Sequence, residues 1–435
     1  DAITRLIVTK DMPERKTKMI KLGDAFIAFP GGTGTLEEIS EVMSCSALEM
    51  LKAPCILYNL NGYYDGLKAG AHDRYGAFDH REAARDIFCL RPRRDQGDTG
   101  KGMTETETSP VLYSAERPAW LDEFCALPEM QRLKHVGMNC GCEYTSFPRF
   151  RGLPKYSRYR HSVGAALIIW HFTGSMAQTL AGLFHDIATP VFAHTVDFLY
   201  GDYMAQEHTE GRTGELIRGS EGITRLLDKY GIAPDKVTDY HIYPVADNDS
   251  PRLSADRLEY TLGNLAAYTG RTSPELQEYY DDLCIAVNEH GETELSFTDA
   301  DTAYRFAHDA LEMSRIYVSD EDRYAMQMLS ELLWRTLEKN VLSAEELYLT
   351  EETVIEKLMS DAETAKLWRG YCALHEIVTD REAFPDGAWR VIGAKKRRID
   401  PFVRGAGRLS EINAQFAGEI KDFMDTPLDR AICAR

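Results

Sequence analysis

The stretch AGLFHDI, residues 181–187, decides the fold of the larger part of this chain. Apolar residues in and just before it recur at the spacing of one helix face, and they lead into a histidine–aspartate pair. Pro190 follows closely, and a proline disfavours helical geometry at the residue before it. We therefore expect a buried helix whose last turns carry His185 and Asp186, in a region that is helical from about residue 111 onward.

The histidine–aspartate pair is informative only together with its flanking residues, because other such dipeptides occur at residues 72–73 and 308–309. The stretch RYRHSVG, residues 158–164, precedes it, and DRLEY, residues 256–260, follows it. Two imidazoles and two carboxylates suit a divalent cation, which can acidify water enough to provide hydroxide near neutral pH. We predict one divalent ion (Mn²⁺, Mg²⁺, Fe²⁺ or Zn²⁺), bound by His161, His185, Asp186 and Asp256.

Two of these four residues also have a simpler interpretation when each is taken alone. A single histidine such as His161 on an apolar helix is more often a hydrogen-bonded core residue than a ligand. Asp256 follows the run LSA, residues 253–255, and could cap the start of a helix. The spacing and flanks of the whole set favour the metal site over these alternatives.

Composition limits the classes of function. The net charge of −19 argues against a protein that coats nucleic acid, although local basic groups still permit small phosphorylated substrates. No apolar run has the length of a membrane span, and nothing near the start resembles a signal peptide. Nine scattered cysteines favour a reducing compartment. We expect a cytoplasmic protein of bacterial origin that forms a homo-oligomer. Its expected partner is a small nucleotide substrate, with no membrane partner.

The N-terminal block alternates apolar strands with a helix. Expected strands at residues 25–29 and 55–58 flank a helix from 36 to about 51, and the stretch PGGTGTLEE, residues 30–38, opens that helix. This is the βαβ order of a parallel sheet, and free amides at the helix start favour an anion. The chain begins at Asp1, close to a further expected strand at 6–8, so we expect an N-terminal truncation.

The predicted fold class is mixed: a truncated Rossmann-like α/β block is followed by an all-α helical bundle. We place the α/β half domain at residues 1–95, a linker at 96–110, the helical core at 111–275 and a helical extension at 276–435. Within the extension, helices are expected at 324–339 and 344–359.

Three N-terminal stretches carry a family resemblance: MPERK at residues 12–16, PGGTGTLEE at 30–38 and NGYY at 61–64. Together they resemble the "lonely guy" (LOG), or lysine-decarboxylase-like, family, whose members release the base from nucleoside monophosphates. The resemblance implies catalytic roles for Arg15 and Glu38, and substrate binding by Gly31, Gly32, Gly34 and Thr35. The family's first half, with its glycine-rich phosphate loop, is missing from this chain, so the block is either a truncated scaffold or a remnant of such an enzyme.

The central stretches HSVG (161–164), AGLFHDI (181–187) and DRLEY (256–260) resemble the HD-domain phosphohydrolases, and most of all the deoxynucleoside triphosphate triphosphohydrolases. QRLK at residues 131–134 and FAH at 192–194 add support. The resemblance implies a helical core around one divalent ion and attack on the α-phosphorus, with release of nucleoside and tripolyphosphate.

The same resemblance implies further roles. Arg158 and Arg257 would contact phosphate, and Tyr260 the sugar or base. The leaving oxygen needs a proton, for which His208 is the first candidate and His194 the second, with Asp197 to orient or tune the imidazole. One departure stands out, because Thr189 occupies a position where the family commonly has another histidine.

That departure leaves other functions open. The HD block could cleave other nucleotide phosphoesters as a phosphatase or phosphodiesterase, or bind nucleotides without turnover as a sensing module. The basic run KKRR, residues 395–398, is either a solvated cluster or an effector site for a nucleotide or polyphosphate, with Arg404 and Arg408 nearby.

Overall fold

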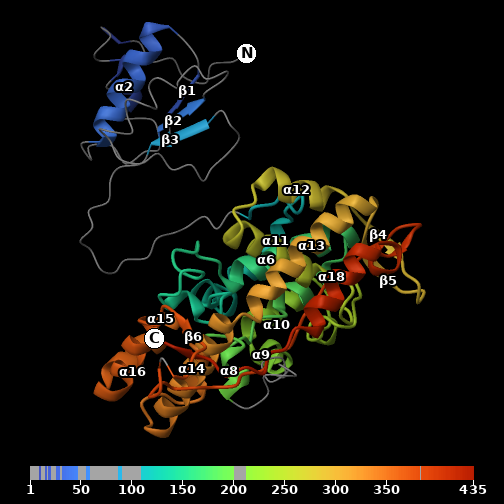
Figure 1. The fold of residues 1–435 in the computed structure, drawn as a ribbon. Helices are drawn as coiled ribbons and strands as arrows, with labels where there is room; N and C mark the ends of the chain where they lie inside the picture. The colour runs from blue at the N-terminus through green and yellow to red at the C-terminus, as the bar shows by residue number, and fades with distance from the viewer. Residues whose placement is uncertain are drawn as a thin grey trace. The chain divides into compact units, whose positions relative to one another are not determined.

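The chain forms two compact units, residues 1–105 and residues 106–435, in a computed structural model. The structure describes residues 9–10, 15–16, 18–20, 26–29, 32–47, 55–58, 87–90, 109–199, 212–382 and 384–435. Figure 1 shows the ribbon of both units. The predicted boundaries of the linker and of the helical core, at 96–110 and 275, stay predictions.

The N-terminal unit contains a three-stranded sheet and one described helix: β1 (Phe26–Ala28), α2 (Thr33–Ala47), β2 (Cys55–Tyr58) and β3 (Ile87–Leu90). β1 and β2 pair in parallel with α2 between them in sequence, which is the predicted βαβ order. β3 pairs antiparallel with β2, a strand that the sequence did not predict. The expected strand at 6–8 and the stretch at 61–64 lie outside the described residues.

The C-terminal unit is mainly helical. Its described α-helices are α4 (Ala119–Cys125), α5 (Pro128–Arg132), α6 (Arg158–Thr173), α7 (Met176–Phe184), α8 (Thr195–Leu199), α9 (Thr213–Gly219), α10 (Glu221–Lys229), α11 (Ala255–Tyr268), α12 (Ser273–Asp281), α13 (Ala300–Tyr317), α14 (Asp320–Glu338), α15 (Glu351–Ser360), α16 (Ala362–Cys372), α17 (Leu409–Ile412) and α18 (Ala414–Asp425). α11 packs against both α6 and α13 in the middle of the unit, and α6 also packs against α7 (Figure 1). This packing places the quoted motifs side by side.

The prediction of an all-α bundle was incomplete. The C-terminal unit also contains the strands β4 (Leu283–Val287), β5 (Thr293–Phe297), β6 (Ile377–Val378), β7 (Phe402–Val403), β8 (Gly407–Arg408) and β9 (Cys433–Ala434). β4 and β5 form an antiparallel hairpin whose turn holds Gly291 at φ +78°. β7 joins β5 in parallel from about 100 residues downstream, a long-range pairing that no local pattern reveals.

The helix ends near the motifs differ slightly from expectation. α7 ends at Phe184, so His185 is its C-cap and Asp186 lies in the turn that follows. The hydroxyl of Ser254, not Asp256, caps α11, since it accepts a hydrogen bond from the amide of Arg257. The expected helix at 344–359 is divided into a short 3₁₀ turn, Glu345–Tyr348, and α15.

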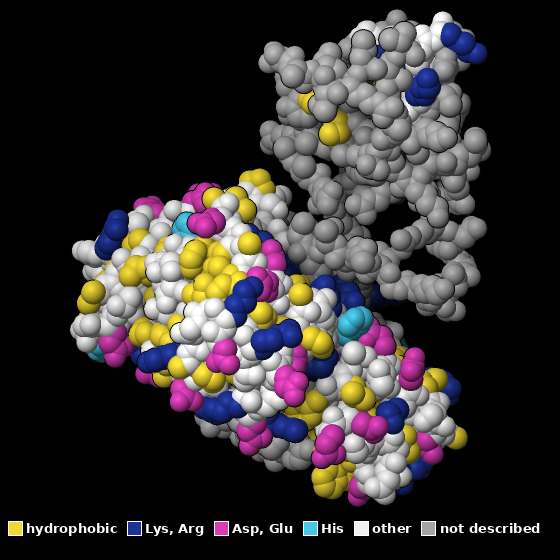
Figure 2. Space-filling model, turned by 180° about the vertical axis from the view of Figure 1, so that it is seen from behind, with side chains coloured by type: hydrophobic (Ala, Val, Ile, Leu, Met, Phe, Trp, Pro, Cys, Tyr) yellow, Lys and Arg dark blue, Asp and Glu magenta, His cyan; other side chains and the backbone are white. Residues whose placement is uncertain are grey.

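Among the described residues, no helix combines the length and the apolar character that crossing a membrane requires. On the face drawn in Figure 2, acidic and basic side chains of the C-terminal unit are interspersed instead of forming separate regions of one sign.

Candidate metal centre and nucleotide cavity

A cavity of about 680 Å³ in the C-terminal unit gathers the four predicted ligands. His161 comes from α6, His185 and Asp186 from the end of α7, and Asp256 from the first turn of α11. Close packing of α6 with both neighbours brings these ends together although 95 residues separate His161 from Asp256.

The four side chains point their ligand atoms at one another. Nε2 of His161 lies 3.1 Å from Nε2 of His185 and 3.0 Å from Oδ1 of Asp256. Oδ2 of Asp186 lies 3.5 Å from Nε2 of His185 and 3.8 Å from Nε2 of His161. His161, His185 and Asp186 can each offer one ligand atom, and these atoms lie within 4.8 Å of one another. The donor types and their convergence fit a single divalent cation.

The second nitrogen of each imidazole supports this interpretation. Nδ1 of His185 is 2.6 Å from the carbonyl oxygen of Gly182, which can only accept, so Nδ1 donates and Nε2 faces the cluster. Nδ1 of His161 is 2.6 Å from Oε2 of Glu259. An acceptor behind each imidazole is the arrangement that orients histidine ligands in metal sites.

Glu259 is fully buried and ties three elements together behind His161. Its carboxylate accepts hydrogen bonds from the hydroxyls of Tyr156, at 2.5 Å, and Tyr113, at 3.3 Å. Gly164 on α6 makes the approach possible, because a Cβ there would lie 2.5 Å from Oε1 of Glu259. The close approach of Glu259 therefore explains sterically why a glycine stands at this position of the HSVG stretch, which the sequence alone did not reveal.

The carboxylates give the cluster a negative field. Burial disfavours the charged form of His161, but the hydrogen bonds that its ring donates to the carboxylates of Asp256 and Glu259 outweigh burial and raise its pKa to about 10. Burial opposes ionisation of Asp186, yet the Arg158 guanidinium lowers the pKa of that carboxyl below its ordinary value. A field that stabilises an imidazolium also favours a divalent cation in the same position.

Arg158 lies beside the cluster and contacts Asp186. Its Nη1 atom is 2.7 Å and 2.9 Å from the two carboxylate oxygens of Asp186. The hydroxyl of Thr189 donates to Oδ1 of the same carboxylate at 2.8 Å. Thr189, at the position where the sequence resemblance leads us to expect a histidine, thus helps to orient a predicted ligand. Arg158 lines the cavity, and its predicted contact with phosphate stays a prediction.

The other predicted substrate residues lie in the same cavity. Arg257 bonds to the side-chain and main-chain oxygens of Asn248, at 2.8 Å and 2.6 Å, and pairs with Asp247 at 3.2 Å. The ring centroid of Tyr260 lies 6.5 Å from those of His161 and Tyr317. Both residues follow Asp256 on α11, which places them at the cluster's edge.

The three proposed proton-transfer residues have different outcomes. His194 lines the cavity. Asp197 belongs to α8, but its side chain is not described, and His208 lies outside the described residues. Their catalytic roles stay predictions.

The structure also places in this cavity residues that the sequence did not connect with the metal site. The amide nitrogen of Asn264 donates to the hydroxyl of Tyr317 at 2.7 Å, while its Oδ1 is buried with no hydrogen-bond partner among the described residues. Lys395 and Arg397 line the same cavity from the C-terminal segment. Asn264 lies eight residues after Asp256 on one helix, so helix spacing could have placed it on the same face.

In the N-terminal unit, Nη2 of Arg15 lies 3.2 Å from Oε1 of Glu38, so the two predicted catalytic residues contact each other. The amide of Thr35 donates to the carbonyl of Gly32 at 3.1 Å in the turn that begins α2. Gly34 lies in that first turn, and Gly31 is outside the described residues. Substrate binding by these residues stays a prediction.

Comparison with known proteins finds two kinds of relatives, which match different parts of this chain. Residues 1–85 match the family model described as possible lysine decarboxylase. A cytokinin riboside 5′-monophosphate phosphoribohydrolase of Rhodococcoides fascians is 53% identical over 62 residues, which are 14% of this chain and 31% of that protein.

Two longer alignments exceed the 105 residues of the N-terminal unit and so extend into the C-terminal unit. The uncharacterized protein YdhJ of Bacillus subtilis is 26% identical over 255 residues, 57% of this chain and 74% of that protein. The metal-dependent phosphohydrolase cns2 of Cordyceps militaris is 27% identical over 210 residues, 46% of this chain and 54% of that enzyme. The chain thus joins a segment similar to LOG-type phosphoribohydrolases to a larger part similar to a metal-dependent phosphohydrolase.

Proposed function

We propose that the C-terminal unit is an HD-type, metal-dependent phosphohydrolase that cleaves nucleoside triphosphates, most specifically deoxynucleoside triphosphates, into nucleoside and tripolyphosphate. One observation carries the proposal: His161, His185, Asp186 and Asp256 converge in a cavity that also holds arginines and tyrosines. The similarity to an enzyme named a metal-dependent phosphohydrolase supports it.

These four residues would hold the ion. A divalent cation there would polarise a phosphoryl oxygen and acidify water. Arg158 keeps the Asp186 carboxylate oriented, and Glu259 keeps Nε2 of His161 facing the cluster. Arg257, at the cavity wall, would neutralise phosphate charge after exchanging its bonds to Asn248.

The chain also offers groups for the rest of the substrate. His194, an imidazole that lines the cavity, would give a proton to the leaving oxygen, and His208 remains the other candidate for this step. Asp197 remains the candidate that would orient or tune the imidazole. The buried Oδ1 of Asn264, with Tyr260 and Tyr317 nearby, suits a sugar hydroxyl and a base.

We propose a second activity for the N-terminal unit, base release from nucleoside monophosphates by Arg15 and Glu38. The contact between these two side chains and the similarity to a phosphoribohydrolase support it. The cysteines whose side chains the structure describes, all in the C-terminal unit, are free thiols, which suits the proposed cytoplasmic location. A homo-oligomer remains part of the proposal.

The test is ion-exchange chromatography of products after the full chain is incubated with nucleoside tri-, di- and monophosphates and Mn²⁺ or Mg²⁺. Nucleoside with tripolyphosphate is the expected result, and Asp186→Ala must abolish it. Orthophosphate as the only phosphate product would instead identify a phosphatase. Binding without any product would favour the sensing alternative. Free base that disappears in Glu38→Gln would establish the second activity.

A further inference from the structure

The QRLK stretch, residues 131–134, reaches the turn beside the metal ligands through one side chain. Arg132, the last residue of α5, is half-buried, and its Nη2 atom donates to the carbonyl oxygens of Ile187, at 3.1 Å, and Thr189, at 2.7 Å. Both carbonyls belong to the turn that directly follows the predicted ligand Asp186. Arg132 therefore holds the main chain beside a ligand, although 55 residues separate it from Ile187.

Thr189 connects Arg132 to the ligand. Its amide donates to the carbonyl oxygen of Asp186 at 2.9 Å, and its hydroxyl donates to Oδ1 of the same residue at 2.8 Å. The other carboxylate oxygen, Oδ2, lies 3.5 Å from Nε2 of His185. The position of Thr189 thus helps to determine which oxygen of Asp186 faces the cluster, and Arg132 helps to determine the position of Thr189.

Arg132 also contacts the C-terminal extension. Its Nη1 atom donates to the carbonyl oxygen of Leu349 at 3.2 Å, in the short segment before α15. Two residues earlier in that segment, the carbonyl oxygen of Leu347 accepts a hydrogen bond from the amide of Val191 at 2.8 Å. The segment that follows Asp186 and the segment that precedes α15 are therefore joined at two points, once through Arg132 and once directly.

The hydrogen bonds of Arg132 suit a guanidinium in particular. Its acceptors are three carbonyl oxygens, and no carboxylate of the described residues forms an ion pair with it. Burial lowers the pKa of Arg132 to about 10, against the effect of the nearby Asp186 carboxylate, so the group keeps its charge at pH 7. A planar guanidinium offers five N–H donors in fixed directions, whereas a lysine ammonium is a compact charge on a flexible chain. The arrangement therefore depends on the shape of this side chain as well as on its charge.

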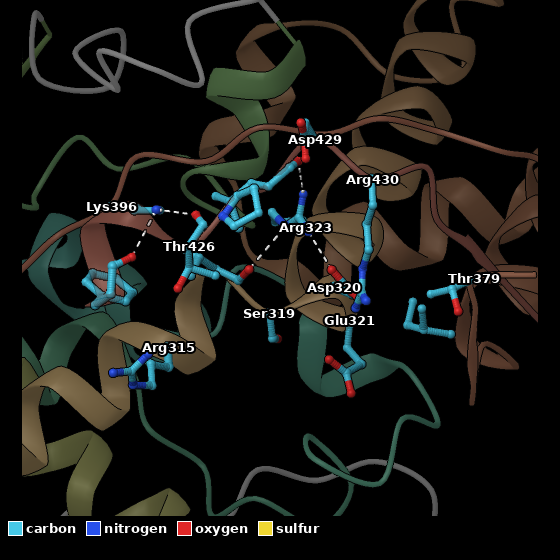
Figure 3. Close-up of a pocket in the computed structure, with 15 residues that line it drawn as sticks. Arg315, Ser319, Asp320, Glu321, Arg323, Thr379, Lys396, Thr426, Asp429 and Arg430 are labelled. Carbon is cyan, nitrogen blue, oxygen red and sulfur yellow. Dashed lines mark hydrogen bonds and ion pairs between the residues drawn. The ribbon is translucent and has the colours of Figure 1, made fainter. Parts of the chain in front are cut away.

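Three other cations of the extension bind groups that are remote in sequence from the predicted ligands. Arg323 is fully buried and contacts the carboxylate of Asp320 and the carbonyl oxygens of Ile392 and Leu428 (Figure 3). Lys396, in the KKRR stretch, donates to three carbonyl oxygens at the end of α18, those of Phe423, Met424 and Thr426 (Figure 3). Arg408 is held by the carboxylates of Glu289 and Glu294. Of the residues predicted for an effector site, Lys396 and Arg408 are thus engaged in contacts that hold the C-terminal segment in place.

We propose that Arg132 is a positioning residue of the metal site, which fixes the turn after Asp186 and couples the placement of this ligand to the C-terminal extension at residues 347–349. The inference rests on the proposed function, because it takes Asp186 to bind a metal ion. It gives the QRLK stretch a role, and it makes the extension part of the support of the site. A change that moves residues 347–349 away from Arg132 should then weaken metal binding without altering any ligand.

Arg132→Lys tests the proposal, because it keeps the positive charge and removes the planar fork. Binding of Mn²⁺ to the full chain, prepared free of metal, is measured by calorimetry at a temperature at which circular dichroism shows each variant to be folded. We expect Arg132→Lys to weaken Mn²⁺ binding by about 10- to 100-fold, as for other groups that orient a metal ligand. Arg335→Lys is the matched control in the same extension, since Arg335 pairs with the exposed carboxylates of Glu363, at 2.8 Å, and Glu338, at 3.3 Å. It should change Mn²⁺ binding by less than about twofold, because exposed ion pairs contribute little.

Thr189 offers a second test that leaves Arg132 in place. Thr189→Val keeps the shape of the side chain but removes the hydroxyl that donates to Asp186. Mn²⁺ binding should weaken by about tenfold, as for a lost hydrogen bond to a charged group. Thr189→Ser keeps the hydroxyl and should restore most of the affinity. An equal loss in Thr189→Ser would contradict the connection through this hydroxyl.

Hydrogen exchange without metal reports on the turn itself. In the metal-free chain, peptides that contain residues 187–191 should exchange faster in Arg132→Lys than in wild type, and at the wild-type rate in Arg335→Lys. Equal exchange of these peptides in the two variants would overturn the proposal, since Arg132 would then have no specific hold on the turn.

The two readouts separate this inference from the proposed function. Unchanged Mn²⁺ binding in Arg132→Lys, with a wild type that binds Mn²⁺, would overturn the inference and leave the proposed function intact. A wild-type chain that binds no metal would reject the proposed function, and the exchange of residues 187–191 would then decide alone whether Arg132 holds the turn.

Discussion

Two arginine–carboxylate pairs, one in each unit, share their chemistry but differ in their surroundings. Arg158 and Asp186 are 8% and 11% exposed and join through two contacts of 2.7 Å and 2.9 Å. Arg15 and Glu38 are 49% and 31% exposed and meet at 3.2 Å. Both pairs lie in stretches that suggested catalysis. The difference shows that a sequence motif identifies the chemical groups of a candidate site, whereas burial determines how much each group contributes to stability.

The physical reason is the cost of removing a charge from water. In the exposed pair, solvent screens the attraction and either partner can be hydrated when the other is lost. In the buried pair, each charge depends on its partner, so loss of one leaves the other unsatisfied. Asp186 is the stronger case because Thr189 and both histidines also depend on it.

The largest expected effect is therefore that of Asp186→Ala. It removes a proposed ligand and leaves Arg158 buried without its carboxylate, which should lower the free energy of unfolding by about 3–5 kcal/mol. Metal content, measured by elemental analysis, should fall to near zero, and nucleotide hydrolysis with it. Asp186→Asn keeps the side-chain shape and serves as the control for volume. Unchanged metal content and hydrolysis in both variants would reject the site.

How much of this site the sequence could predict depended on how close its parts lie along the chain. His161, His185, Asp186 and Asp256 were identified because each sits in a short, specific stretch, and close helix packing does place them together. Glu259 was quoted in one of those stretches without a role. Its role depends on facing Nδ1 of His161, which follows from the packing of α11 on α6 and not from either helix alone.

The sequence could not place in the cavity those residues that lie far from these stretches along the chain. Tyr317, Lys395 and Arg397 reach the cavity only because α13 and the C-terminal segment fold back over α11. The β4–β5 hairpin was missed although Gly291 marks its turn, because a helical pattern dominates the residues before and after it. In the N-terminal unit, the parallel pairing of β1 with β2 was predicted from local order, whereas the antiparallel β3 was not.

A smaller effect is expected from the residue behind His161. Glu259→Gln keeps the size but removes the charge that faces Nδ1 of His161, so the imidazole loses its orienting acceptor. Metal affinity should fall by about 10- to 100-fold, the usual effect of losing a group that orients a ligand. Competition with a chelating indicator dye measures it. Tyr113→Phe, which removes only the longer 3.3 Å contact to the same carboxylate, should change affinity much less. Equal losses in the two variants would contradict the assigned role.

Glu143 and Glu351 form a third pair of neighbouring side chains. This pair extends the comparison because it is buried and consists of two carboxylates, with no arginine. Burial, with the nearby charge of Glu351, raises the pKa of Glu143 to about 8, and Oε2 of Glu143 has no hydrogen-bond partner among the described residues. The folded chain keeps a proton here that the unfolded chain loses near its ordinary pKa of 4.5. Stability should therefore fall as pH rises from about 5 to about 8, by on the order of 1 kcal/mol per pH unit.

Glu143→Gln removes this titration. The variant should be more stable than the wild type at pH 8, and its free energy of unfolding should depend less on pH across that range. Denaturant unfolding at pH 5, 6.5 and 8 measures both quantities. Glu352→Gln, at a neighbouring carboxylate whose pKa is lowered, is the control and should not flatten the curve. Parallel pH curves for Glu143→Gln and wild type would contradict the assignment.

The smallest effect on stability belongs to the exposed pair. Arg15→Ala and Glu38→Gln should each change the free energy of unfolding by no more than about 1 kcal/mol, because both side chains are substantially exposed and solvent replaces the lost partner. If the proposed base release occurs, the same substitutions should abolish it, since a contact that contributes little to folding can still hold a phosphate or a developing positive charge. Lys16→Gln, which removes the adjacent ion pairs with Glu37 and Glu41, is the matched control and should leave base release intact. A large loss of stability in Glu38→Gln would show that this pair resembles Arg158 and Asp186 after all.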